Sequence, residues 1–210
     1  MLTNVYVDGF NLFYGRLKGR PYKWLDLDAL AHHLLPRHEI NHIRYFTARV
    51  IAWPNDLDKP DRQDLYLRAL STIPHLSIHL GRFQVSTVRM RLANPPLDGP
   101  SVAEVIKVEE KGTDVNLGAY LVADALTCDY EAAVVISNDA DLAEPIRMVR
   151  QDYGLPVGIF NPQHPRKRSG ELEKTQPWFF RQLHAGDLIG CQFPERLYDR
   201  DGEIQRPKGW

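Results

Sequence analysis

The stretch Ala132-Ala133-Val134-Val135-Ile136-Ser137-Asn138-Asp139-Ala140-Asp141 decides the fold, because five apolar residues run without interruption into an acidic turn. An apolar run of this length, rich in β-branched residues, is typical of a strand buried on both faces of a parallel sheet. The chain begins in a similar way, since the segment from Leu2 to Val7 reads as a buried strand and stops at Asp8-Gly9. Both segments therefore predict central strands of an α/β sheet.

Helical and extended segments alternate along the rest of the chain. The pattern predicts helices over residues 11–17, 27–35, 59–73, 113–127, 142–153 and 178–184. It predicts further strands over 40–52, 76–80 and 155–160. This alternation implies an α/β fold with three layers, α/β/α, and a mainly parallel central sheet. In the helix over 113–127, two apolar stripes predict that most of the circumference is buried.

The length of 210 residues favours a single core domain with additions. We expect the core over residues 1–160, with a β insertion at about 82–109, where two extended segments flank a proline-rich loop. Residues 161–210 are expected to form a C-terminal helix and a tail packed on the core. Within that tail, Arg200-Asp201-Gly202-Glu203 resembles a hairpin turn.

Composition excludes several classes of protein. There are 26 basic and 27 acidic residues, a net charge of -1, so any surface that binds a polyanion must be local. No apolar run is long enough to span a membrane, and the N-terminus lacks the basic region of a signal peptide, so we expect a cytoplasmic protein with no membrane partner. Two cysteines, Cys128 and Cys191, are too few for a disulfide framework and lack the spacing of a zinc ribbon.

Four aspartates are the candidate catalytic residues. Asp8, Asp139 and Asp141 follow buried strands, and in a parallel sheet the carboxyl ends of the strands meet at one crevice. Asp114 lies in the first turn of the helix over 113–127 and can face the same crevice. Four neighbouring carboxylates repel one another unless cations neutralise them, and hard oxygen ligands select Mg²⁺ or Mn²⁺.

Each aspartate also has a purely structural interpretation. Asp141 and Glu144 have the spacing of a capping box, Asp114 or Thr113 can cap a helix, and Asp8 can belong to an ordinary turn. Taken singly, these roles account for each residue as well as catalysis does. They explain neither the acids at the ends of two strands nor the cluster after the most hydrophobic strand.

Three motifs follow one another along the chain. Val7-Asp8-Gly9-Phe10-Asn11-Leu12 resembles the opening Asp-Gly-x-Asn of the NYN proteins, the LabA-like branch of the PIN-like nucleases. Glu110-Lys111-Gly112-Thr113-Asp114-Val115 is similar to its Lys-Gly-x-Asp helix start, and Ser137-Asn138-Asp139-Ala140-Asp141-Leu142 to its Ser-Gly-Asp-Ser-Asp-Phe. The motifs span residues 5 to about 160 in family order, and the tail lies outside them.

The resemblance implies a PIN-like fold in which Asp8, Asp114, Asp139 and Asp141 bind the metal and catalyse the reaction. Metal chemistry then predicts an endoribonuclease in which one ion generates hydroxide from water and a second stabilises the departing 3′-oxygen, which leaves 5′-phosphate and 3′-hydroxyl ends. The sequence departs from the family at Asn138, usually glycine, and at Leu142, usually phenylalanine. Asn138 tolerates the left-handed backbone that glycine permits, although its side chain narrows the site.

The expected partner is RNA, as single strands or structured loops. The predicted substrate-binding residues are Asn11, Lys111, Ser137, Asn138, Arg166, Lys167 and Arg168. Arg82, Arg89 and Arg91 form a second basic cluster on the insertion, and either cluster can also be an ordinary solvated face. The aromatic run Trp178-Phe179-Phe180 fits a homodimer surface or, more readily, core packing.

Several alternatives remain. An RNA-binding or scaffolding protein with a degenerate site is the main one, because of Asn138 and Leu142. A phosphatase of the haloacid dehalogenase type needs an acid two residues after Asp8, where the chain has Phe10, and no dinucleotide-binding glycine motif follows the first strand. Asp124 is too far along its helix to share a site with Asp114, so we expect a structural or surface role for it.

Overall fold

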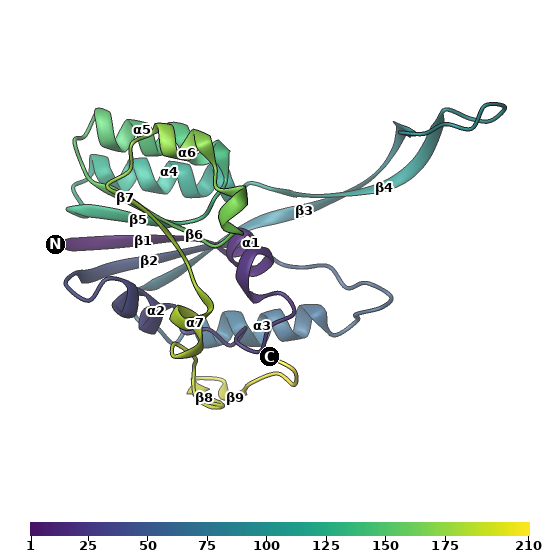
Figure 1. The fold of residues 1–210 in the computed structure, drawn as a ribbon. Helices are drawn as coiled ribbons and strands as arrows, with labels where there is room; N and C mark the ends of the chain where they lie inside the picture. Colours follow the sequence, from purple (N-terminus) through teal and green to yellow (C-terminus); the bar gives the residue numbers. More distant parts are fainter.

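A seven-stranded sheet forms the centre of the computed structural model, which describes all 210 residues (Figure 1). Its strands lie in the order β4-β3-β2-β1-β5-β6-β7. All neighbours are parallel except β3 and β4. The bounds are β1 Leu2–Asp8, β2 Glu39–Ala48, β3 Leu76–Arg91, β4 Val102–Lys111, β5 Ala132–Ile136, β6 Val157–Asn161 and β7 Phe179–Gln182. The predicted α/β fold with a mainly parallel sheet is confirmed.

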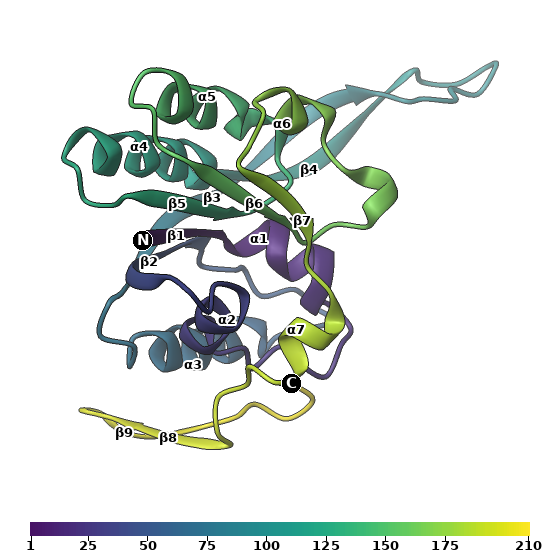
Figure 2. The same cartoon turned by 60° about the vertical axis from the view of Figure 1, so that its left-hand side comes forward.

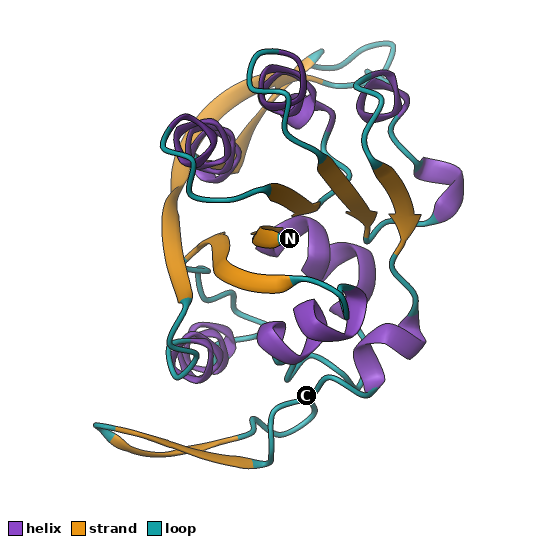
Figure 3. Ribbon diagram, turned by 90° about the vertical axis from the view of Figure 1, so that its left-hand side faces the viewer, coloured by secondary structure: helices purple, strands orange, loops and turns teal.

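Helices cover both faces of the sheet, as Figure 3 shows in a view along the strands. The longer ones are α2 Leu27–Leu34, α3 Lys59–Leu70, α4 Thr113–Leu126 and α5 Ala143–Gln151. The short ones are α1 Gly9–Leu12, η1 Phe13–Leu17, η2 Ala140–Leu142, η3 Pro165–Lys167, α6 Gly170–Lys174 and α7 Ala185–Ile189. In Figure 1, α4, α5 and α6 lie on one side of the sheet, and α2, α3 and α7 lie on the other.

Alternation along the central strands divides the core in two. Val5 and Val7 of β1 pack with the side chains of α2 and α3, whereas Tyr6 packs with those of α4 and α5. Successive side chains of a strand point to opposite faces, so a strand covered on both sides must be apolar at every position that packs. This is why the apolar runs in β1 and β5 predict the centre of the sheet correctly.

The helix expected over residues 178–184 is wrong, because Phe179–Gln182 forms the edge strand β7. Phe179 packs against the core cluster of α2 and α3, and Phe180 packs against that of α4 and α5. Two adjacent aromatic side chains that reach opposite faces fit the two-residue period of a strand. Residues 161–210 therefore contribute a strand to the sheet as well as a tail.

The helix α4 buries one stripe, not most of its circumference. Leu117, Leu121 and Ala125 are buried against the sheet and α5, whereas Val115 and Leu126 are 75% and 67% exposed. The expectation of two buried stripes is wrong because α4 lies in an outer layer, with the sheet on one side and solvent on the other.

The β insertion is a long hairpin. β3 continues from the core without a break and pairs with β4 from Arg82–Lys111 to Arg91–Val102, and the hairpin extends far beyond the body of the protein (Figures 1 and 2). A second, short hairpin joins β8 Arg196–Asp199 to β9 Gly202–Gln205, which confirms the predicted turn in the tail. No helix has the length and apolarity that crossing a membrane requires.

Candidate metal centre

The candidate site lies where the connections of the sheet diverge. The chain leaves β1 through α2 to reach β2 on one side, and it reaches β5 on the other side through α4, which covers the opposite face. The carboxyl ends of β1 and β5 therefore border a crevice of the kind that binds ligands in open α/β sheets. Asp8 is the last residue of β1, and Asp139 follows β5.

Three carboxylates from separate elements meet in this crevice. Asp8, Asp114 and Asp139, which we call the acid cluster, each have a carboxylate oxygen within 4.8 Å of the other two. Asp8 is buried, and Asp114 and Asp139 are half-buried. The fold thus brings Asp8 together with two acids that lie more than 100 positions further along the chain.

Hydrogen bonds fix the orientation of Asp8. Its Oδ1 accepts from the backbone N–H of Asn11 at 2.9 Å, and its Oδ2 accepts from Ser137 Oγ at 2.9 Å. Ser137 Oγ in turn accepts from the backbone N–H of Asp139 at 3.1 Å. The side chain of Asp8 therefore caps α1 and also ties β1 to the acidic turn after β5, so the structural and the candidate functional roles coexist.

The start of α4 places Asp114. Gly112 precedes the helix with a φ of 100°, a left-handed conformation that side chains other than glycine rarely adopt. Glu110 then caps the helix, because its carboxylate accepts from the backbone N–H of Thr113 at 3.2 Å and from Thr113 Oγ1 at 2.6 Å. This turn brings Asp114 into the crevice one residue after the buried Thr113.

Burial and neighbouring negative charges raise the pKa values of two carboxyl groups in the acid cluster. Burial raises the pKa of Asp8 to about 7, and the hydrogen bonds from Asn11 and Ser137 oppose this shift while the charges of Asp114 and Asp139 add to it. Burial, followed by the charges of Asp139, Glu110 and Asp141, raises the pKa of Asp114 to about 6. The ionised cluster is therefore destabilised, and a bound cation would relieve that cost.

The donor set fits a hard divalent cation. Three carboxylates from rigid elements converge, and each offers one oxygen to the same small volume. Oxygen ligands of this type select Mg²⁺, Mn²⁺ or Ca²⁺ over softer metals. The burial of Asp8 is an independent indication, because a buried carboxylate without a cationic partner is costly.

Asp141 lies at the edge of this site. It is exposed and outside the acid cluster, although its charge contributes to the raised pKa of Asp114. Its backbone N–H donates to Asp139 Oδ1 at 3.0 Å, so Asp139 rather than Asp141 caps η2. The capping box considered for Asp141 and Glu144 is not formed, and Glu144 pairs with Arg147 instead.

Asn138 connects the acidic turn after β5 to the loop that carries the basic segment. Positive φ values occur outside glycine only at Cys128 and Gln176, so the turn forms without the left-handed backbone that Asn138 tolerates. Its Nδ2 donates to the carbonyl of Lys167 at 2.8 Å, and its Oδ1 accepts from the backbone N–H of Ser169 at 2.9 Å. The side chain thereby holds the basic segment Arg166-Lys167-Arg168 beside the acid cluster.

Asn11 connects the same loops. Its Oδ1 accepts from the backbone N–H of Asn138 at 3.2 Å and from Gln163 Nε2 at 3.1 Å. Arg166, Lys167 and Arg168 are all exposed, and Arg168 also pairs with Glu173 and lies over the ring of Phe180. Lys111 ends β4 next to Gly112, and it lies 3.5 Å from Glu109. Arg82, Arg89 and Arg91 lie along β3, and all three are exposed.

A model of the NYN domain matches residues 2–181 of this chain. The chain belongs to the NYN domain family. NYN domains are part of the PIN-like nuclease superfamily, so the match agrees with the fold and with the acid cluster.

Two other proteins are similar to this NYN protein. The protein named 6-hydroxy-3-succinoylpyridine 3-monooxygenase HspA, from Pseudomonas putida, is 32% identical, and the alignment covers 99% of this chain and 75% of HspA. A solved structure of a protein of unknown function from Vibrio parahaemolyticus superposes with a TM-score of 0.57 and 15% identity, over 89% of this chain and 94% of that one. The second likeness concerns the fold alone.

Asp124 and four histidines of the NYN protein have structural partners away from the acid cluster. Asp124 Oδ2 accepts from Tyr6 OH and from Arg44 Nε, both at 2.6 Å, so it is a buried structural acid. Four histidines also contact separate groups: His38 contacts Thr3, His42 lies near Asp129, His75 contacts Asp28 and His79 contacts Ser77.

Sequence reasoning missed two features of the site. Glu110 lies close enough to raise the pKa of Asp114, and its position three residues before the helix turn at Thr113 was the available signal. Aromatic and basic side chains that follow Asp8 also line a cleft beside the acid cluster. The run Phe10-Asn11-Leu12-Phe13-Tyr14 contains that signal, but its partners lie far away in the chain.

Proposed function

We propose that this protein is a metal-dependent endoribonuclease that hydrolyses RNA to give 5′-phosphate and 3′-hydroxyl ends. The observation that carries the proposal is the acid cluster at the carboxyl edge of the sheet, in a chain of the NYN family. Asp8, Asp114 and Asp139 would hold Mg²⁺ or Mn²⁺, with Asp141 next to them. A divalent ion supplies Lewis acidity there, which activates water and offsets the charge on the departing oxygen.

The chain's own residues orient the acids and the RNA. Ser137 and the backbone of Asn11 hold the Asp8 carboxylate in one rotamer, so its orientation is set before substrate arrives. Lys111, Arg166 and Lys167 are exposed cations around the acids and would contact the phosphates on either side of the scissile bond. Asn138 positions two of these cations through its bonds to the loop.

The test is cleavage of end-labelled single-stranded RNA with Mg²⁺, with Mn²⁺ and with EDTA. Asp139→Asn should reduce the rate by roughly a hundredfold or more. Asp98→Asn in the exposed hairpin loop is the matched control and should cleave normally. Cleavage that persists in EDTA or in Asp139→Asn would contradict the proposal. Products with 3′-phosphate ends would contradict the proposed chemistry.

A protein that binds RNA without cutting it is the alternative within the family. In that case the protein would bind RNA, and salt would lower the affinity. No metal would support cleavage, and Asp139→Asn would leave RNA binding unchanged. The cleavage assay and a binding assay on the same RNA distinguish the two functions.

The name of the Pseudomonas relative favours one candidate of another class, a monooxygenase that acts on a hydroxypyridine. Such an enzyme inserts one atom of O₂ into its substrate and reduces the other to water with two electrons from a reductant. The test is oxygen uptake with 6-hydroxy-3-succinoylpyridine and a nicotinamide reductant. Uptake with formation of a hydroxylated product, in a protein that does not cleave RNA, would replace the nuclease proposal.

A further inference from the structure

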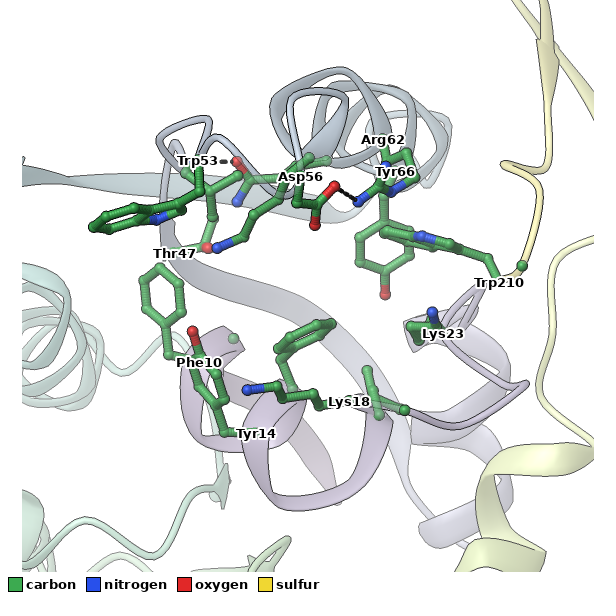
Figure 4. A pocket seen from close by; sticks show the side chains of 18 of the residues that line it. Phe10, Tyr14, Lys18, Lys23, Thr47, Trp53, Asp56, Arg62, Tyr66 and Trp210 are labelled. Carbon is green, nitrogen blue, oxygen red and sulfur yellow. Dashed lines mark hydrogen bonds and ion pairs between the residues drawn. The ribbon is translucent and has the colours of Figure 1, made fainter.

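A cleft of about 540 Å³ adjoins the metal centre without including it. Its walls come from α1 and η1, from residues 45–56, from α3 and from the C-terminal residues 208–210 (Figure 4). Gly9 and Phe10 line one end, directly after Asp8 in the chain, but no member of the acid cluster lines the cleft. The volume is within the range of roughly 300–1,000 Å³ that is usual for small-molecule sites.

Aromatic side chains face this cleft from both walls. Phe10 and Tyr14 lie on one wall with ring centroids 6.5 Å apart and a 23° angle between their planes, and Trp53 lies on the opposite wall (Figure 4). Tyr14 and Trp53 are 55% and 45% exposed. Large aromatic surfaces left open to solvent on the walls of a concave site are suited to stacking on a planar ring.

The cleft is also strongly cationic in a chain whose net charge is -1. It is lined by the basic residues Lys18, Lys23, Lys59, Arg62 and Lys208. The one acidic side chain that lines it, Asp56, is paired with Arg62. Burial, together with the charges of Arg62 and Arg206, lowers the pKa of Lys23. Uncompensated positive charge in a partly desolvated cleft favours an anion.

In this cleft, exposed aromatic rings and basic side chains lie next to one another, unlike the side chains of an ordinary solvated surface. Lys18 Nζ lies 5.0 Å from the ring centre of Tyr14, and Lys23 Nζ lies 5.6 Å from that of Trp210, so the cations lie beside the aromatic rings. A ligand with a ring and a negative group can therefore contact both kinds of side chain at once. A neutral ring or a bare anion can contact only one.

We propose that this cleft binds a planar aromatic ring that carries an anionic group, with the ring against Tyr14 and Trp53 and the anion at Lys18, Lys23 and Lys59. A nucleotide and a free aromatic acid share this chemistry. The proposal concerns binding alone and does not depend on the nuclease activity.

The test is calorimetric titration of the full chain in EDTA, so that a metal at the acid cluster has no part in the result. The probes are uridine monophosphate, benzoate, uridine and inorganic phosphate. We expect the first or the second to bind at least about tenfold more tightly than uridine and phosphate. Tighter binding of the nucleotide assigns the cleft to nucleotides, and tighter binding of benzoate assigns it to free aromatic acids.

Variants with matched controls locate the binding. Tyr14→Ala and Lys18→Ala should each weaken it about fivefold or more, whereas Tyr198→Ala and Lys174→Ala, at exposed positions elsewhere, should not. All four positions are exposed, and unfolding curves check that the variants fold. Binding of neither aromatic anion above the level of uridine and phosphate, or binding that Tyr14→Ala and Lys18→Ala leave unchanged, would overturn the proposal.

Discussion

Ser137 Oγ donates a hydrogen bond of 2.9 Å to Asp8 Oδ2 and so joins the ends of β5 and β1 beneath the acid cluster. Ser137 is fully buried, and the same oxygen accepts from the backbone N–H of Asp139. One hydroxyl thus sets the positions of two of the three acids. This hydrogen bond gives the acid cluster a rigid support.

Replacing Ser137 tests this support of the acid cluster. Ser137→Ala should lower the free energy of unfolding by roughly 1–3 kcal/mol, because Asp8 and the N–H of Asp139 each lose a buried partner. It should also weaken Mn²⁺ binding by about tenfold or more, as loss of groups that orient metal ligands does. Urea unfolding and Mn²⁺ titration measure the two effects. Ser101→Ala, in the exposed hairpin loop, is the control, and equal effects at both positions would contradict the role of Ser137.

The raised pKa of Asp8 predicts how stability changes with pH. In the folded protein Asp8 has a pKa of about 7, against an ordinary value of 3.8, so between these values the folded state binds a proton that the unfolded state has lost. Stability without metal should therefore fall as pH rises from about 4 to 7. The contribution of Asp8 is at most about 4 kcal/mol for a shift of about three units.

Asp8→Asn removes the buried negative charge of Asp8. In EDTA at pH 8, the variant should therefore unfold at a higher urea concentration than the parent. At pH 4 the difference should largely vanish, because the parent carboxyl is then protonated when folded. Excess Mn²⁺ at pH 8 should stabilise the parent and not the variant. A variant that is less stable than the parent at pH 8 in EDTA would show that burial of the Asp8 charge has no such cost.

Asn138→Gly restores the residue that the family usually has and tests the loop contact. The change removes two hydrogen bonds to residues 167 and 169, so residues 165–169 should exchange amide protons faster and stability should fall by about 1 kcal/mol. RNA affinity should also decrease, because the basic segment is no longer held beside the acids. Unchanged exchange in this loop would mean that other contacts hold it.

The basic segment Arg166-Lys167-Arg168 should bind RNA through the phosphate groups. The double variant Arg166→Ala, Lys167→Ala should weaken single-stranded RNA binding and reduce the slope of log affinity against log salt by about 1.4, or about 0.7 for each phosphate that is no longer neutralised. Arg147→Ala with Lys174→Ala removes two surface cations that pair with neighbouring acids on α5 and α6, and it should leave the slope unchanged. The same slope in both double variants would exclude a role for Arg166 and Lys167 in binding phosphates.

Asp124 should matter for stability alone. Asp124→Asn breaks a buried pair with Arg44 and weakens the acceptor of Tyr6 OH, which should cost about 3 kcal/mol or more and lower Tm by several degrees. Mn²⁺ affinity of the folded variant should equal that of the parent. Thermal unfolding and Mn²⁺ titration measure both quantities, and a large loss of Mn²⁺ affinity would mean that Asp124 contributes to the metal centre.

The sequence predicted the features that depend on periodicity within one segment. The apolar runs of β1, β5 and β6 identify the strands, and their shared direction explains why Asp8 and Asp139 meet. β7 was missed because a short strand that begins after Trp178 has too few residues to establish a two-residue period. The outward position of Asp141 was not predictable either, since it depends on the η2 turn that Asp139 caps.

Features that combine distant segments were beyond sequence reasoning. The aromatic cleft draws Tyr14, Trp53 and Trp210 from three separate parts of the chain, and no spacing in the sequence connects them. The contact of Asn138 with the loop at Lys167 has the same origin. Only the folded chain brings residues 10–23, 45–66 and 208–210 around one cleft.

Crystals of the protein soaked in Mn²⁺ provide the most direct test of the metal centre, through an anomalous difference map. We expect a peak within coordination distance of Asp8, Asp114 and Asp139, which disappears in Asp114→Asn crystals treated in the same way. A fully occupied Mn²⁺ site elsewhere, with no peak at these acids, would contradict the assignment of the acid cluster as the metal centre. So would the absence of a peak at these acids in crystals of protein that cleaves RNA with Mn²⁺.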